Sequence, residues 1–146
     1  LAPICFFNLP SKYKKCDFLC LDIPELRLAT GDRYSSIEFL ASKLKKQMGA
    51  SSILITMGEK GLYFKKTLSK KDRTFVIPGF ETNPIDTMGA GDVTFSLSSI
   101  LNKVCKDEKV IAFLANLAGA IKTNIYGHEK FISKQNFIKS IDHLLK

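Results

Sequence analysis

The stretch Ser52–Thr56, SILIT, decides the fold class of this 146-residue chain. It is a continuous apolar run bounded by turn-forming residues, which is typical of a strand buried on both faces of a parallel sheet. A similar run, Asp17–Leu21 (DFLCL), precedes it. Between the two, apolar residues at helical spacing predict an amphipathic helix that begins at a Ser35 or Ser36 cap and ends near Met48. Strand, helix and strand in this order predict an α/β fold with helices on a largely parallel sheet.

The other predicted elements continue this alternation along the chain. They are a short helix over Ile23–Thr30, strands over Leu62–Lys65 and Thr74–Ile77, and helices from Ala90 to about Leu101, over Lys109–Ile125 and over Ser133–Leu145. Ligands of such folds gather at the carboxyl ends of the strands. No apolar run is long enough to cross a bilayer, and Leu1–Pro10 lacks the basic region of a signal peptide. Because the chain starts at Leu1 without Met, we expect it to be part of a longer protein.

The net charge of +8 comes from 22 Lys and Arg against 14 Asp and Glu. An excess of this kind suits nucleic acid, a membrane surface or a polyanionic ligand such as a nucleotide. The absence of Trp and of aromatic residues interleaved with basic ones gives nucleic-acid binding little support. The basic clusters are short, and we expect them on solvated faces: Lys12, Lys14 and Lys15; Lys43, Lys45 and Lys46; Lys65 and Lys66. The four cysteines are expected to be reduced, buried thiols.

The segment Ile85–Asp92, IDTMGAGD, has the composition of an anion-binding helix N-terminus. Gly89, Ala90 and Gly91 allow a ligand close to the backbone, where unpaired amides and the positive end of the helix dipole would face it. Asp92 beside those amides suits a base that takes a proton next to a phosphoryl group. The segment is not a Walker A loop, since no Lys-Ser or Lys-Thr pair follows the glycines. The alternative is an ordinary helix N-terminus with an acidic first turn.

Three further segments have both a structural and a functional interpretation. TMGEKG at Thr56–Gly61 is either a plain hairpin turn or a loop lying against a ligand. The acidic pair Asp22 and Glu25 lies at a strand-to-helix junction, where capping is the alternative to metal binding. Asn116 lies in an apolar helix rich in small residues and requires a hydrogen-bond partner there.

DTMGAGD resembles the signature of the PfkB/ribokinase carbohydrate kinases, and the resemblance extends from about Asp17 to the end of the chain. It implies a Rossmann-like, three-layer α/β/α ribokinase-type fold. Residues 1–146 would be its C-terminal nucleotide-binding and catalytic part, without the N-terminal half that carries the lid and most sugar contacts. The resemblance also implies that Asp92 deprotonates the sugar hydroxyl, while the amides of Gly89, Ala90, Gly91 and Asp92 form the anion hole.

The resemblance assigns ligands to other residues as well. Those implied to contact ATP or its Mg²⁺ are Thr56, Gly58, Gly61, Asn116, Asp22 and Glu25. Those implied to hold a monovalent cation such as K⁺ are Asp86, Met88 through its carbonyl, Gly127 and Ser133. Two positions depart from the family pattern: Asp22 stands where Asn is usual, and Thr94 where a Phe commonly follows the catalytic Asp.

The function implied is ATP-dependent phosphoryl transfer to a hydroxyl of a sugar or sugar phosphate, in the cytoplasm and with no nucleic-acid or membrane partner. Family members often form homodimers through the lid. The tail from Ala118 to Lys134 resembles kinases of heptose phosphates, some of which are fused to a nucleotidyltransferase domain. The alternatives are a nucleoside or vitamin-like alcohol as acceptor, a catalytically silent nucleotide-binding module, and a nucleic-acid binder supported by charge alone.

Overall fold

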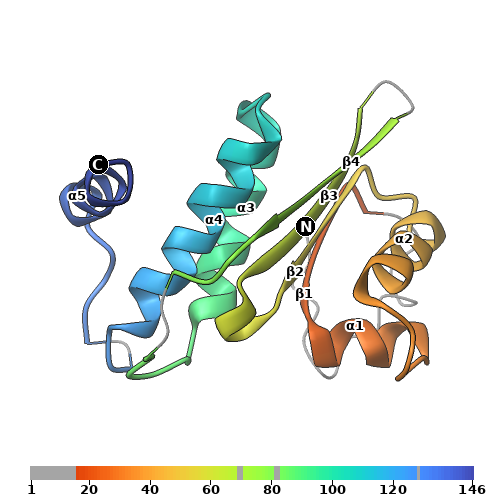
Figure 1. The fold of residues 1–146 in the computed structure, drawn as a ribbon, viewed down its shortest axis with the longest axis horizontal. Helices are drawn as coiled ribbons and strands as arrows, with labels where there is room; N and C mark the ends of the chain where they lie inside the picture. The colour runs from red at the N-terminus through yellow and green to blue at the C-terminus, as the bar shows by residue number, and fades with distance from the viewer. Residues whose placement is uncertain (1–15, 69–70, 81–82, 128) are drawn as a thin grey trace. The chain divides into compact units, whose positions relative to one another are not determined.

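The computed structural model describes residues 16–68, 71–80, 83–127 and 129–146, and these form two compact units (Figure 1). The first unit comprises the chain up to Gly58 together with Leu62–Val76. The second comprises Glu59–Gly61 and Ile77–Lys146. Each unit has its own set of internal contacts.

The first unit is a four-stranded sheet with two helices. Its elements are β1 (Phe18–Asp22), α1 (Ile23–Thr30), α2 (Ile37–Gln47), β2 (Ser52–Thr56), β3 (Leu62–Leu68) and β4 (Lys71–Ile77), and the strand order is β1-β2-β3-β4. β1 and β2 pair in parallel, as predicted, but β3 pairs antiparallel to β2. The prediction of a largely parallel sheet therefore holds for the β1–β2 pair. A single 3₁₀ turn, η2 (Gly58–Lys60), instead of an α-helix, connects β2 to β3 and returns the chain antiparallel.

The core of the first unit lies between the sheet and α1 and α2. Alternate strand residues face the helices, because side chains along a strand point to opposite faces. The core residues are Leu19, Leu21, Leu26, Leu40, Ala41, Leu44, Met48, Ala50, Ile53, Ile55 and Tyr63, all buried. The Ser36 side chain caps α2 by accepting a hydrogen bond from the Phe39 amide, as its position before the apolar stripe predicts.

The second unit contains α3 (Ala90–Val104), α4 (Glu108–Thr123) and α5 (Lys134–Leu144). α3 and α4 lie side by side over much of their length (Figure 1). The Asp107 side chain caps α4 by accepting hydrogen bonds from the amides of Lys109 and Val110. Within the described ranges no helix is long and apolar enough to span a membrane. Cys16, Cys20 and Cys105 are free thiols, but each is half-buried, not fully buried as expected.

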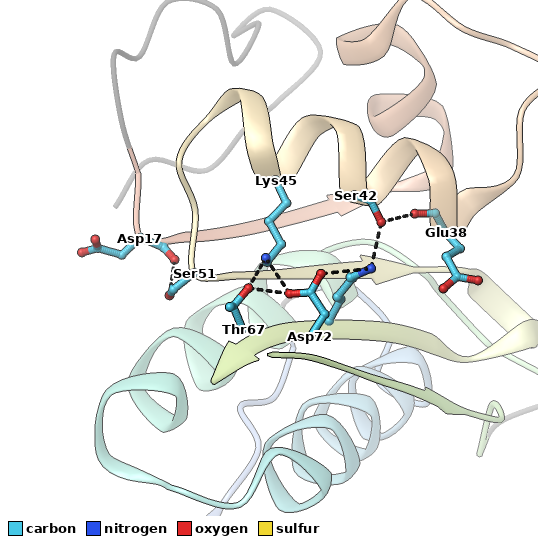
Figure 2. Close-up of polar contacts among 8 residues, drawn as sticks. Asp17, Glu38, Ser42, Lys45, Ser51, Thr67 and Asp72 are labelled. Carbon is cyan, nitrogen blue, oxygen red and sulfur yellow. Dashed lines mark hydrogen bonds and ion pairs between the residues drawn. The ribbon is translucent and has the colours of Figure 1, made fainter. Parts of the chain in front are cut away.

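Two lysines of the first unit contradict the expectation that the basic clusters are solvated. Lys45 on α2 and Lys65 on β3 are both only 8% exposed. Figure 2 shows how the Lys45 ammonium is held between Thr67 and Asp72. The Lys45 ammonium donates to the Thr67 hydroxyl and pairs with Asp72 Oδ1 at 3.3 Å. The Lys65 ammonium donates to Ser42 Oγ at 2.9 Å and pairs with Asp72 Oδ2 at 3.3 Å.

Asp72 therefore bridges two buried ammonium groups and connects β4 to both α2 and β3. Thr67 Oγ1 also donates to Asp72 Oδ1, at 2.6 Å. The hydrogen bond from Thr67 and then those from Lys45 and Lys65 hold the pKa of Asp72 below its ordinary value. Such a carboxylate stabilises the fold at pH values above its unfolded-state pKa of about 3.9. This contribution is lost as the pH falls through the lower folded-state pKa.

Asp72→Asn should destabilise the protein by about 1–3 kcal/mol at neutral pH, because two buried ammonium groups lose their shared counter-charge. The difference from wild type should shrink below about pH 4, where the wild-type carboxylate also becomes protonated. Urea unfolding across this pH range measures both effects. Asp142→Asn, at an exposed position on α5, is the matched control and should change stability by less than about 0.5 kcal/mol. Equal effects of the two substitutions at neutral pH would contradict the bridging role.

Candidate active site

The N-terminus of α3 presents open backbone donors. Gly89 precedes the helix in the left-handed conformation, with φ of 75° and ψ of 2°. The amide of Ala90 donates to the Thr87 carbonyl at 3.2 Å, so this one of the expected donors is already occupied. Within the part of the chain that the structure describes, the amides of Gly91 and Asp92 have no acceptor. The positive end of the helix dipole lies at the same place.

Asp92 lies in the first turn of α3 and is exposed. Its backbone carbonyl accepts a hydrogen bond from Ser96 Oγ at 2.7 Å, within the same helix. Gly91 beside it is also exposed, and a Cβ built on it would meet no atom within 4 Å. Neither packing nor a left-handed backbone therefore requires glycine at position 91, whereas close approach of a ligand would. A carboxylate, two open amides and open space lie together here.

α3 rests on α4 through a close contact behind this turn. Thr94 is 3% exposed, and a Cβ built on Gly119 of α4 would lie 2.7 Å from Thr94 Oγ1. The small residue on α4 thus lets the two helices approach closely. Thr94, which departs from the family pattern, occupies a packing position and leaves the neighbouring Asp92 exposed.

Asp86 and Gly127, two of the residues expected to hold a monovalent cation, lie together. Asp86 Oδ2 accepts a hydrogen bond from the Gly127 amide at 2.8 Å, and Oδ1 accepts one from the Met88 amide at 2.8 Å. The amides of Ile85 and Asp86 both donate to the Thr123 carbonyl, at 2.9 and 3.0 Å. These bonds join the segment before α3 to the end of α4.

Ser133, the fourth expected ligand, is the N-cap of α5. Its hydroxyl oxygen accepts a hydrogen bond from the Asn136 amide at 3.2 Å. Its side chain is therefore engaged in helix capping.

Lys122, which the sequence analysis did not single out, belongs to the same region. It is 5% exposed, and its ammonium donates to the carbonyls of Gly127 at 2.7 Å and Ile125 at 3.4 Å. The burial of Lys122 could have been predicted from helical spacing. Lys122 follows the buried residues Ile111, Ala115 and Ala118 on the same stripe of α4.

Asn116 finds its partner in the loop after β4. Its Nδ2 donates to the Pro78 carbonyl at 2.7 Å, and the Phe80 ring packs edge-on against Phe113, with centroids 5.3 Å apart. This amide therefore holds the segment Pro78–Phe80 against α4. A nucleotide could therefore bind only to the hydrogen-bond donors and acceptors of the Asn116 side chain that the Pro78 carbonyl does not use.

The glycines of TMGEKG have separate structural reasons. Gly61 has φ of 91°, and a Cβ on it would lie 2.5 Å from the Gly79 nitrogen and the Pro78 carbonyl carbon, so glycine is needed for close backbone approach. Gly58 has φ of 59° with nothing within 4 Å, so its glycine suits a left-handed turn that leaves space around it.

In the first unit, Asp22 and Thr56 are direct partners at the carboxyl ends of the parallel strands β1 and β2. Asp22 Oδ1 accepts from the Glu25 amide at 2.7 Å, and Glu25 Oε2 accepts from the Asp22 amide at 3.0 Å. This reciprocal capping box is the structural alternative that the sequence left open. Among the described residues, no group of three or more His, Cys, Asp or Glu could hold a metal ion.

The structure thus distributes the predicted site residues over both units. Asp22, Glu25, Thr56 and Gly58 lie in the first unit, and Gly61, Asp86, Met88, Gly89, Ala90, Gly91, Asp92, Asn116, Gly127 and Ser133 lie in the second.

Open amides at a helix N-terminus are a common arrangement for binding phosphate groups and other anions. The family model of the pfkB family carbohydrate kinases matches residues 9–134. The chain belongs to the pfkB family of carbohydrate kinases, which confirms the resemblance identified from DTMGAGD.

Curated relatives match the chain over part of their length. A deoxyribokinase of Salmonella typhi is 38% identical over 81 residues, which cover 53% of this chain and 25% of the relative. The bifunctional protein HldE of Koribacter versatilis is 28% identical over 120 residues, which cover 80% of this chain and 24% of the relative. Fructokinase-2 of Oryza sativa subsp. japonica is 32% identical over 114 residues, which cover 77% of this chain and 31% of the relative. The matched stretch thus spans between 24% and 31% of the length of these relatives.

Solved structures of ribokinase type confirm the predicted fold class. A ribokinase of Thermotoga maritima superposes with a TM-score of 0.76 at 17% identity, covering 94% of this chain and 46% of that one. A ribokinase of Arabidopsis thaliana complexed with ribose and ATP superposes with a TM-score of 0.74 at 18% identity, covering 90% of this chain and 43% of that one. At these identities the likeness concerns the fold.

Gly119→Ala should destabilise the protein by about 1–3 kcal/mol, because the added methyl group meets the Thr94 hydroxyl in a closely packed contact. Thr94→Ala removes that oxygen, so the double variant Thr94→Ala/Gly119→Ala should lose less stability than the sum of the single variants. The expected coupling is about 0.5–3 kcal/mol, measured in a double-mutant cycle of chemical unfolding. Additive effects would show that the two helices do not meet at these residues.

Proposed function

We propose that the protein transfers the γ-phosphoryl group of ATP to a hydroxyl of a sugar or sugar phosphate, with Asp92 as the general base. Membership of the carbohydrate kinase family supports the reaction class. The observation that carries the proposal is the N-terminus of α3, where an exposed carboxylate lies beside the open amides of Gly91 and Asp92. A base and an anion hole at one helix end are the two elements this reaction requires.

In this mechanism the Asp92 carboxylate accepts the proton of the acceptor hydroxyl as the hydroxyl oxygen attacks the γ-phosphorus. The bond between that phosphorus and the bridging oxygen of ADP breaks, and ADP leaves with the electron pair. The amides of Gly91 and Asp92 and the helix dipole stabilise the negative charge on the phosphoryl oxygens. The Ala90 amide contributes less, because it already donates to the Thr87 carbonyl.

The chain's acidic pair fits an indirect role toward Mg²⁺, which prefers oxygen ligands and keeps several of its waters. Glu25 lies at the carboxyl end of β1, three residues after Asp22 and within the first turn of α1, and we assign to its carboxylate a contact with a metal-bound water. When bound, Mg²⁺ would neutralise charge on the ATP phosphates. Thr56, Gly58, Gly61 and Asn116 remain the residues proposed to contact ATP.

The acceptor and the rest of the enzyme belong to the same proposal. We propose that residues outside this chain supply the lid and most acceptor contacts, that turnover requires them, and that pairing into a homodimer occurs through that lid. Sugar and sugar phosphate acceptors are favoured because the relatives include a deoxyribokinase and a fructokinase. We further propose that the acceptor is a heptose phosphate, that the full-length protein is fused to a nucleotidyltransferase domain, and that it is located in the cytoplasm. A screen of sugars, sugar phosphates and nucleosides with the full-length protein identifies the acceptor.

Asp92→Asn should lower kcat of the full-length protein by about 10²–10⁴-fold, because the amide cannot take the hydroxyl proton. Folding and ATP affinity should change little, since the Asp92 side chain is exposed. A coupled ADP-release assay measures turnover, and calorimetric titration measures ATP binding. Asp142→Asn is the matched control and should keep full activity. An Asp92→Asn enzyme as active as the control would exclude the proposed base.

Gly91→Ala separates the ligand-approach role of this glycine from a role in folding. Position 91 is helical with open space around it, so alanine should preserve or raise stability, by up to about 1 kcal/mol. The methyl group would meanwhile stand where the phosphoryl group must approach, and turnover should fall by about 10²-fold. Thermal unfolding and kcat/KM, measured on the same preparation, report the two effects. Unchanged turnover would mean that no ligand comes close to this backbone.

A further inference from the structure

The loop at the end of α4 carries its own buried cation. The Lys122 ammonium is held by the carbonyls of Gly127 and Ile125, and the side chain is 5% exposed. A buried ammonium requires oxygen partners, because desolvation of an unpaired charge is strongly unfavourable. Carbonyl oxygens are also the groups that replace the hydration shell of K⁺ in proteins. Lys122 therefore holds the loop in the way that a bound monovalent cation would.

The residues implied to hold K⁺ do not fit that ion well in this chain. The Gly127 carbonyl is taken by Lys122, and the two oxygens of Asp86 accept from the amides of Gly127 and Met88. The Ser133 hydroxyl caps α5. A second cation sharing the Gly127 carbonyl would also be repelled by the ammonium already there, with few waters to screen the two charges.

These contacts connect Lys122 to the anion hole. Lys122 holds Gly127, the Gly127 amide donates to Asp86, and Asp86 accepts from the Met88 amide directly before the turn at Gly89. Two residues, Gly127 and Asp86, thus connect the Lys122 ammonium by hydrogen bonds to Met88, directly before the turn that starts α3. A positive charge at this point positions the turn that presents the open amides.

We propose that the Lys122 ammonium replaces the monovalent cation in this protein, so that the loop 122–127 is ordered, and phosphoryl transfer proceeds, without K⁺. Lys122 is a positioning residue, because it acts through Gly127 and Asp86. The part of the proposal that concerns turnover rests on the proposed kinase function. The part that concerns order of the loop does not.

The test compares the full-length wild-type protein with Lys122→Met, which keeps an unbranched side chain only one atom shorter and removes its charge. KCl is titrated against choline chloride at constant ionic strength, and both the thermal unfolding midpoint and initial rates are followed. The wild type should show no K⁺-specific change in either. Lys122→Met should lose turnover in choline chloride and regain it with K⁺ by about 5–150-fold, the usual range of coupling between two bound groups. Its unfolding midpoint should rise with K⁺ in parallel.

Lys109→Met is the matched control, since Lys109 is exposed on the same helix, and it should behave as wild type. K⁺-specific stabilisation or activation of the wild type would overturn the proposal, and so would a Lys122→Met protein with wild-type stability and rate in choline chloride. If Lys122→Met does not fold, the wild-type titration alone decides. If the protein shows no phosphoryl transfer, the kinase proposal fails, while the unfolding midpoints still decide the role of Lys122.

Discussion

The site depends on one backbone constraint, the left-handed turn at Gly89 that starts α3. This conformation is readily available to glycine and ends the preceding loop abruptly. The amides of Gly91 and Asp92, which belong to the first turn of this helix, have no carbonyl of the described chain to bind. Unpaired amides at an exposed helix end are normally satisfied by water, and an anionic ligand can replace that water. The chemistry proposed for Asp92 follows from the position of its carboxylate beside those donors.

Both units contain buried lysine ammonium groups. Lys45 and Lys65 share Asp72 in the first unit, whereas Lys122 is held by backbone carbonyls in the second. The chemical difference matters. An ion pair with a carboxylate depends on pH and on both partners, but carbonyls keep their partial charge at every pH. The contacts of Lys122 therefore do not depend on a titratable partner, which suits the positioning role proposed for it.

The sequence predicted most helices and strands to within a few residues, because apolar spacing and caps such as Ser36 mark them directly. It also located the α3 N-terminus, since DTMGAGD is a local pattern. The hairpin turn between Thr56 and Gly61 was also predicted, but the prediction of a largely parallel sheet left out its consequence, an antiparallel β3. The buried lysines were missed because charge alone was used to predict exposure. Helical spacing places Lys122 on the buried stripe of α4, but only the fold reveals the carbonyls that hold it.

The glycines show why a motif alone cannot identify a site. Gly61 is required because the backbone at Pro78 and Gly79 lies against it, and Gly119 because Thr94 does. Gly91 has neither a packing neighbour nor a left-handed backbone, so nothing within the described chain explains it. In a helix interior, glycine costs about 0.5–1 kcal/mol relative to alanine. A glycine that lowers helix stability without improving packing is consistent with the proposed approach of a phosphoryl group to the backbone at the start of α3.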